Sequence, residues 1–198
     1  GAKRIGASEQ SYSIQGQMNT PVFDCKYVMN DSEWDKFAKC MNRLGEIANS
    51  MGISLVYHHH MGTVVQTAEE VDRMMAMTDK DKFSLLFDSG HLAYCDQDYL
   101  EVLAKYADRV KHVHLKDIRP NVVKKVKEQK LSFLQGVREG SFTVPGDGCI
   151  DFAPIFAILD KANYQGWMIV EAEQDPAKAN PLEYAIKARK YIKDIANI

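Results

Sequence analysis

The segment Phe83-Ser-Leu-Leu-Phe-Asp88 has the length and apolar content of a buried β-strand, and it ends on a carboxylate. Uninterrupted apolar strands are typical of parallel sheets whose faces are covered by helices. The pattern changes to helical spacing on both sides of this segment. Residues 67–77 begin with the capping box Thr67-Ala-Glu-Glu70, and residues 98–107 place apolar side chains at steps of three and four. The segment is therefore predicted to be a strand between two helices.

Four further segments have strand character: residues 3–8, 53–57, 110–114 and 167–170. Each of the five predicted strands is followed by a segment with helical spacing, and no hairpin signal joins two of them. Strands that alternate with helices pair in parallel and connect by right-handed crossovers. The order predicts a single unit over residues 1–198, either a doubly wound sheet or part of a (β/α)8 barrel.

Two of the segments between the strands carry specific expectations. The first predicted helix begins at Asp31 or Ser32 and ends before Gly52. Its apolar residues are expected on one buried face: Trp34, Phe37, Met41, Leu44, Ile47 and Ala48. Residues 120–140 are basic in their first half and are expected to form a surface helix or a lid.

The composition argues against several classes of protein. The 198 residues carry 25 basic and 27 acidic side chains, a formal net charge of −2, which does not favour a nucleic-acid partner. No apolar run approaches the roughly 18 residues of a membrane span. The four cysteines show no CxxC spacing, and this favours a reducing, cytoplasmic location.

Polar residues gather where the predicted strands end. All six histidines lie there, together with several carboxylates: His58, His59, His60, His91, His112, His114, Glu9, Asp88, Asp117, Glu171 and Glu173. The carboxyl ends of parallel strands meet at one rim, where functional groups converge. A single such histidine is more often a hydrogen-bonded core or capping group, and Asp88 alone could cap a helix. However, His112 and His114 share one strand face, as do Glu171 and Glu173. The pattern favours a catalytic metal site for Mn, Co, Zn or Fe.

Four motifs carry a resemblance to a known family. They are Asp88-Ser-Gly-His91, His112-Val-His-Leu-Lys-Asp117, Pro145-Gly-Asp-Gly-Cys-Ile-Asp151 and Gly166-Trp-Met-Ile-Val-Glu171. With them the chain resembles the xylose-isomerase-like TIM barrel family of metal enzymes. Three longer motifs resemble its branch of keto-inositol dehydratases: residues 55–66, 139–148 and 171–176. The resemblance implies a (β/α)8 barrel of which this chain carries the last five β/α units.

The resemblance also implies an activity and its partners. It implies a metal-dependent hydro-lyase that removes water from a keto-inositol, so that the partner is a small polyol ketone. The implied cofactors are a divalent ion such as Mn or Co, and glutathione. The alternatives are a sugar isomerase or epimerase that uses the same site, a zinc phosphodiesterase, and a non-catalytic fragment.

Residue roles follow only from the resemblance. It implies His58, Asp88, His114 and Glu171 as the metal ligands, with Glu9 competing for the place of His58. It places His59, His60, His112 and Asp117 near the substrate. Proton transfer is expected from Glu9, Lys116, Glu173 and His91.

Five units cannot close an eight-stranded barrel. Two parallel edges are left open, so we expect this chain either to need further strands or to form a homo-oligomer through those edges.

Overall fold

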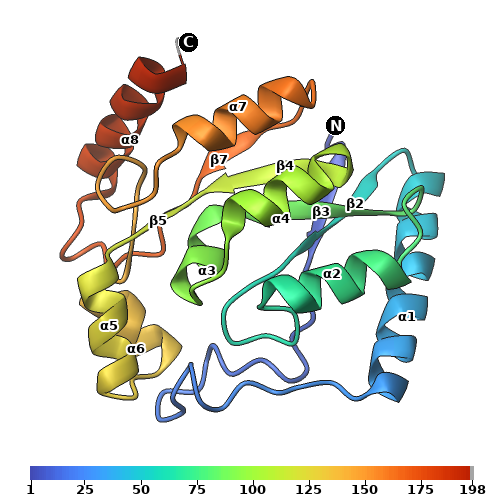
Figure 1. Cartoon of the computed structure of the whole chain (residues 1–198), viewed down its shortest axis with the longest axis horizontal. Helices are drawn as coiled ribbons and strands as arrows, with labels where there is room; N and C mark the ends of the chain where they lie inside the picture. The colour runs from blue at the N-terminus through green and yellow to red at the C-terminus, as the bar shows by residue number, and fades with distance from the viewer. Residues whose placement is uncertain (197–198) are drawn as a thin grey trace.

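A computed structural model describes residues 1–196 and shows five parallel strands in one sheet, in the order β1-β2-β3-β4-β7 (Figure 1). The strands are β1 (Arg4–Ala7), β2 (Ser54–His58), β3 (Phe83–Asp88), β4 (Val110–Leu115) and β7 (Met168–Val170). Their order in space follows their order along the chain, as successive right-handed β/α units require. The predicted parallel sheet and the partial (β/α)8 barrel are confirmed.

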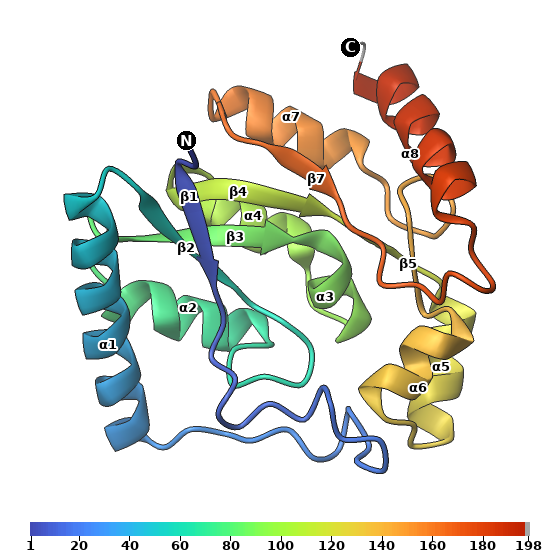
Figure 2. The same cartoon turned by 180° about the vertical axis from the view of Figure 1, so that it is seen from behind.

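Helices connect the strands and pack on one face of the sheet. They are α1 (Asp31–Ser50), α2 (Ala68–Met77), α3 (Ser89–Tyr94), α4 (Tyr99–Tyr106), α7 (Ala153–Lys161) and α8 (Pro181–Ala196). Figure 2 shows the sheet from the other side, with the strands in front of these helices. The predicted capping box at Thr67 is present, because its side chain accepts a hydrogen bond from the Glu70 backbone N–H while Glu70 caps the Thr67 N–H.

The hydrophobic core lies between the sheet and the helices. Every second strand residue points into it, including Leu55, Tyr57, Leu85 and Phe87, all of which are buried. The intervening residues point to the concave face of the sheet. This alternation separates a packed apolar layer from a face that is free to carry functional groups.

Helix α1 differs from the expectation in one respect. Trp34, Phe37 and Met41 are buried as predicted, but Leu44 and Ile47 are 41% and 44% exposed. The periodicity placed them on the apolar stripe correctly. However, the sheet ends at β1, so this side of the helix has no neighbour among the described residues.

The expected lid consists of two helices, α5 (Pro120–Glu128) and α6 (Phe133–Glu139), below the carboxyl ends of the strands (Figure 1). A second, smaller hydrophobic cluster holds them, with Val126, Phe133 and Phe142 at its centre. Val22 and Met61 join this cluster from two loops. A short antiparallel strand pair, β5 (Asp117–Ile118) with β6 (Phe142–Thr143), joins the segments before and after these two helices. This pair was not predicted.

Within residues 1–196, no helix combines the length and the apolarity that a bilayer crossing requires.

Candidate metal and catalytic site

Four predicted metal ligands converge at the carboxyl ends of four strands. His58 and Asp88 are the last residues of β2 and β3, His114 is the penultimate residue of β4, and Glu171 directly follows β7. Asp88 and His114 are register partners in adjacent strands. Parallel pairing thus brings together side chains that are far apart in the sequence.

Asp88 is at the centre of this group, which we call the metal cluster (His58, Asp88, His114 and Glu171). Its Oδ2 atom lies 3.2 Å from His58 Nε2 and 3.4 Å from His114 Nδ1. Its Oδ1 atom accepts a hydrogen bond from the backbone N–H of His91, so Asp88 also caps α3. The capping interpretation and the metal-ligand interpretation therefore apply to two different oxygens of one carboxylate.

The donor atoms of the metal cluster fit a cation. His114 Nδ1 and Glu171 Oε2 are 2.9 Å apart, yet neither has an aligned hydrogen-bond partner among the described residues. His114 Nδ1 faces the carboxylates of both Asp88 and Glu171, so once the imidazole loses its proton its lone pair and theirs converge on one point, where a metal ion would satisfy them. Imidazole and carboxylate ligands together suit Mn, Fe, Co or Zn.

His91 offers a second arrangement. Ligand atoms of His58, Asp88, His91 and Glu171 all lie within 4.8 Å of one another, as do those of His60, His91 and Glu173, and His114 is in neither of these two groups. However, His91 Nε2 already accepts a hydrogen bond from Lys116 Nζ at 2.9 Å. His91 is thus engaged by the lysine, whereas His114 faces the carboxylates of Asp88 and Glu171.

Lys116 is fully buried beside the metal cluster. Its ammonium group lies 2.7 Å from Glu171, 2.8 Å from Glu173 and 3.5 Å from Asp88. It also lies 5.0 Å from the centre of the Phe142 ring, within the range of a cation–π contact. We call Lys116, Glu173, His91 and His60 the lysine cluster.

The charges of the two clusters set their protonation states. Burial alone would raise the pKa of Asp88, but Lys116 and the surrounding imidazoles outweigh it and hold that pKa well below its usual range. Burial is likewise outweighed at Glu171, where His114 and Lys116 lower the pKa to about 2. The pKa of Glu173 is lowered by His60 and Lys116 in spite of its burial. All three carboxyl groups are thus charged at neutral pH.

The pKa values of the basic side chains shift in different directions. Burial lowers the pKa of His114, but Asp88 and Glu171 more than compensate and raise it to about 9. The three carboxylates likewise raise the pKa of Lys116 against the effect of its burial. At His58 and His91 burial dominates and lowers the pKa, so both imidazoles are neutral.

A cavity of about 460 Å³ opens beside the metal cluster on the concave face of the sheet. His58, His112 and His114 line it together with Arg4 and Ser8 from the β1 region. Its volume is within the range of small-molecule sites. The structure therefore places His112 next to the metal cluster, as the shared strand face predicted.

Three predicted site residues are not brought into either cluster. Glu9 lines a separate hollow against α1, and its carboxylate accepts the backbone N–H of Ser11. His59 is completely buried on the opposite side of its strand, where its Nε2 accepts the Asp88 backbone N–H. Asp117 is also buried and accepts four backbone N–H groups, those of Ile118, Gly148, Cys149 and Ile150. We assign none of the three to substrate or proton transfer below.

Sequence reasoning missed residues that support the lysine cluster. Gly90 leaves room for the Lys116 side chain, and the Ser89 hydroxyl donates a hydrogen bond to the Lys116 carbonyl. Gln15, in the loop after β1, contacts the His60 ring. A loop residue has no periodicity that could reveal such a contact, whereas the Gly in Asp88-Ser-Gly-His91 was a visible signal.

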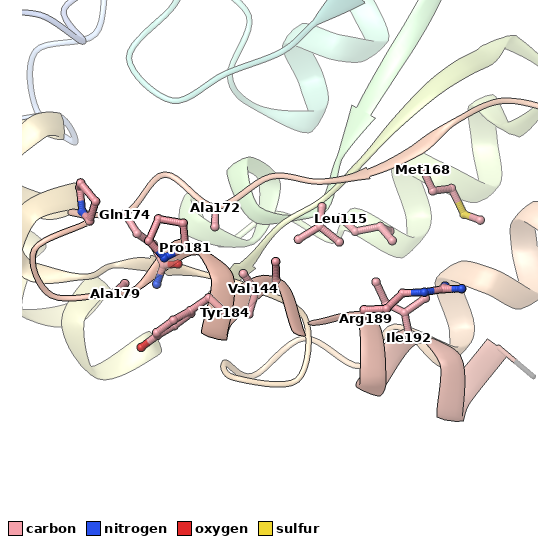
Figure 3. A pocket seen from close by; sticks show the side chains of 13 residues that line it. Leu115, Val144, Met168, Ala172, Gln174, Ala179, Pro181, Tyr184, Arg189 and Ile192 are labelled. Atoms are coloured by element: carbon pink, nitrogen blue, oxygen red, sulfur yellow. The ribbon is translucent and has the colours of Figure 1, made fainter. Parts of the chain in front are cut away.

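A second cavity, of about 370 Å³, lies away from both clusters between the sheet and α8 (Figure 3). Its walls are mostly apolar, with Leu115 from β4, Met168 from β7, and Tyr184 and Ile192 from α8. None of the predicted metal ligands lines it.

Comparisons with known proteins agree with this fold. A model of the "Xylose isomerase-like TIM barrel" family matches residues 15–195. A curated relative from Clostridium perfringens, named inosose dehydratase, is 66% identical over 198 residues, which are all of this chain and 67% of that protein. The chain thus spans about two thirds of the length of that relative.

Solved structures share the fold at low identity. A xylose isomerase-like TIM barrel protein from Mycobacterium smegmatis in complex with magnesium has a TM-score of 0.68 at 18% identity, over 99% of this chain and 61% of that one. The IOLI protein with a bound zinc atom has a TM-score of 0.66 at 18% identity, over 98% of this chain and 63% of that one. At such identities the likeness concerns the fold alone.

Proposed function

Because the chain belongs to the xylose isomerase-like TIM barrel family, we propose that it is an inosose dehydratase, a hydro-lyase that removes water from a keto-inositol with a divalent metal ion. Curated relatives at 56–66% identity bear this name. The single observation in the structure that carries the proposal is the convergence of His58, Asp88, His114 and Glu171 around one point, with Lys116 and Glu173 beside it.

The charge balance supports a divalent ion. Asp88, Glu171 and Glu173 contribute three negative charges, and the Lys116 ammonium neutralises one of them. Without an ion, protonation of His114, whose pKa is raised to about 9, offsets a second charge, and a bound cation would take the place of that proton. Buried like charges are costly unless a cation separates them. When bound by the metal cluster, a divalent ion supplies Lewis-acid stabilisation of the enolate that forms from the ketone.

We assign proton removal to Glu173. Its carboxylate is charged, and it lies at the edge of the site with 28% of its side chain exposed, where a substrate can reach it. In the proposed elimination Glu173 takes the proton from the carbon next to the ketone, a C=C bond forms, and the C–O bond of the β-hydroxyl breaks. The hydroxyl leaves with a proton as water, so the reaction is balanced without any oxidant or reductant.

Lys116 and His91 complete the machinery. The ammonium group of Lys116 holds Glu173 and Glu171 in place and opposes negative charge that develops on substrate oxygens. His91, which is neutral and fully buried, fixes the ammonium by accepting one of its N–H bonds. His60 and His112 are assigned to contacts with the polyol hydroxyls.

The remaining assignments belong to the same proposal. Mn or Co is the proposed ion, and glutathione is kept as a cofactor on family resemblance alone. The four cysteines Cys25, Cys40, Cys95 and Cys149 are free thiols, which supports a cytoplasmic location. A polyol ketone is the proposed partner, without nucleic acid or membrane.

Metal analysis tests the site directly. The purified chain is expected to bind about one Mn²⁺ or Co²⁺, measured by calorimetry and elemental analysis after dialysis. Asp88→Asn keeps a cap for α3 and Glu171→Gln keeps the side-chain shape, yet each should weaken metal affinity at least tenfold. Glu139→Gln, at an exposed ion pair with Lys125, is the matched control. Equal affinity in all four proteins would refute the assignment.

The reaction is tested by its product. With 2-keto-myo-inositol, an active preparation should yield a hydroxy-enone, or the 1,2-diketone that forms from it by tautomerisation, with loss of one water, detected by absorbance and mass spectrometry. Glu173→Gln is expected to lower kcat by about 100-fold or more. Interconversion of ketohexoses without loss of water would instead identify an isomerase or epimerase and contradict the proposal.

A further inference from the structure

Two aromatic rings from the lid lie against the lysine cluster. The ring centre of Phe142, in β6, is 5.0 Å from the Lys116 ammonium nitrogen and 5.1 Å from the centre of the His91 ring. Phe133, in α6, has its ring centre 5.3 Å from that of His60. Both phenylalanines are buried, so the lid presents aromatic carbon to the charged groups of the cluster.

The backbone fixes the place of the Phe142 ring. Helix α6 ends at Gly140, whose φ of +86° allows the chain to leave the helix and enter β6. Phe142 then pairs with Ile118 in the antiparallel ladder of β5 and β6, and Ile118 lies two residues after Lys116. The strand pair therefore brings the ring to the lysine through main-chain contacts.

The other partners of the Lys116 ammonium group belong to two different clusters. It donates one N–H bond to Glu173 Oε2 at 2.8 Å and another to His91 Nε2 at 2.9 Å, both in the lysine cluster. Glu171 at 2.7 Å and Asp88 at 3.5 Å, both in the metal cluster, attract the same charge. The position of the ammonium thus depends on the balance between the two sets of attractions.

The face of the Phe142 ring contributes to this balance. The quadrupole of an aromatic ring attracts a cation within roughly 6 Å of its centre, and the attraction is larger where water is excluded. Here the lysine and the phenylalanine are both completely buried. Because the ring also contacts His91, it favours the ammonium position within the lysine cluster.

We infer that Phe142 is a positioning residue, whose ring face holds the Lys116 ammonium beside Glu173 and His91 by a cation–π contact. The ammonium in turn holds the Glu173 carboxylate where it removes the proton from the substrate. This second step rests on the proposed dehydratase function, whereas the contact between the ring and the ammonium does not. The inference also assigns a role to the motif at residues 139–148, which carries Phe142.

Fluorinated phenylalanines incorporated at position 142 test the contact with little change in ring size. One, two and three fluorine atoms withdraw increasing charge from the ring face, so a cation–π contact weakens stepwise. The ammonium is followed in ¹H–¹⁵N spectra of the chain with ¹⁵N-labelled lysine, and the Lys116 signal is assigned by its loss in Lys116→Arg. We expect slow exchange of its protons with water in the wild type and faster exchange with each added fluorine.

Phe152 is the matched control position. Its ring is also completely buried and packs against Tyr191, and no cation lies over it in the described part of the chain. The same fluorinated series at Phe152 should leave the exchange of the Lys116 ammonium unchanged. Phe142→Leu removes the ring and should accelerate the exchange at least as much as three fluorine atoms. The fluorinated series also covers the case in which Phe142→Leu fails to fold.

Kinetics measure the consequence in an active preparation. Across the fluorinated series at Phe142, kcat should fall about 10-fold with little change in KM, and the series at Phe152 should change neither. Unchanged ammonium exchange at Phe142, or an equal response at both positions, would overturn the cation–π contact. Faster exchange with constant kcat would overturn the positioning of Glu173. Absence of dehydratase activity in every protein, together with the expected spectra, would instead count against the proposed function and leave the contact supported.

Discussion

Lys116 shows how a charged residue can be fully buried in this chain. Its ammonium group is surrounded by three carboxylates, and its methylene groups lie against Gly90. A buried charge is stable only when it is paired and its donors are satisfied. The position of the ammonium therefore depends on the space that its stem occupies as well as on its partners.

Substitution of Gly90 tests this dependence. A Cβ at position 90 would lie 2.5 Å from Cγ and 2.8 Å from Cδ of Lys116, so Gly90→Ala must displace the lysine stem. Although Ala is normally the better helix former, we expect a loss of about 1–3 kcal/mol in unfolding free energy and a reduced kcat. Urea denaturation measures the first effect. Gly16→Ala, whose Cβ meets nothing within 4 Å, is the control, and equal stability of both variants would contradict the packing argument.

The prediction of site residues from the sequence depended on the alternation of side chains along strands. His114 follows His112 by two residues and Lys116 follows by two more, so that all three point to the concave face. Glu171 and Glu173 are related in the same way. Gln15 and Phe142 could not be found, because their contacts depend on how a loop and a lid pack.

At the scale of elements, Asp117 connects β5 to the loop before α7. Burial raises the pKa of its carboxyl group in spite of the four backbone N–H groups that it accepts. Asp117, which the family resemblance placed near the substrate, therefore stabilises the loop before α7 instead.

Replacement of Asp117 separates these two roles. Asp117→Asn turns an N–H donor toward backbone donors, so we expect a loss of about 2–4 kcal/mol in unfolding free energy. Metal affinity and KM should remain within about twofold. Asp151→Asn, an exposed carboxylate that accepts the Ala153 N–H, is the control. A large rise in KM without a loss of stability would restore the substrate-binding role.

A second loop contact predicts a dependence on pH. Burial acts against ionisation of Asp147, but Lys187, Thr143 and Arg119 donate to it and lower its pKa overall. A lowered pKa contributes stability above the pKa of the unfolded chain, and this contribution is lost as the pH falls through the folded value. The difference in urea midpoint between wild type and Asp147→Asn should therefore shrink from about pH 5 to about pH 3. Asp108→Asn, at an exposed position, should show no such trend, and a difference that stays constant across this range would contradict the assignment.

Most elements could be predicted, because apolar spacing and capping residues are local signals. The five strands and helices α1, α2 and α4 follow from these signals, to within a residue or two at the ends, whereas the short helix α3 was not predicted. Burial of Leu44 and Ile47 was wrong for a reason outside the helix itself: the neighbouring layer ends at β1. The short β5–β6 pair also escaped prediction, since two-residue strands carry no periodicity.

The whole molecule has two open sheet edges. Ile5 on β1 is 51% exposed and Ile169 on β7 is 41% exposed, and neither edge is paired among residues 1–196. Exposed parallel edges with apolar side chains promote association.

We expect the isolated 22.4 kDa chain to form dimers or larger assemblies, with light scattering after gel filtration as the measurement. The double substitution Ile5→Lys with Ile169→Lys should shift the population toward monomer. Lysine at the exposed position Leu182 on α8, away from either strand, is the control. A monomeric wild-type chain at micromolar concentration would show that the open sheet edges do not drive association.

Successive residues after β7 face opposite sides of the sheet, and this has a consequence for laboratory evolution. Ala172 and Gln174 line the apolar cavity against α8 (Figure 3), whereas Glu171 and Glu173 contact Lys116 in the proposed site. A bulkier side chain at Ala172 would push the same backbone from behind. Libraries that randomise the wall of the cavity should therefore yield variants with altered turnover, although none of the changed residues can touch the substrate.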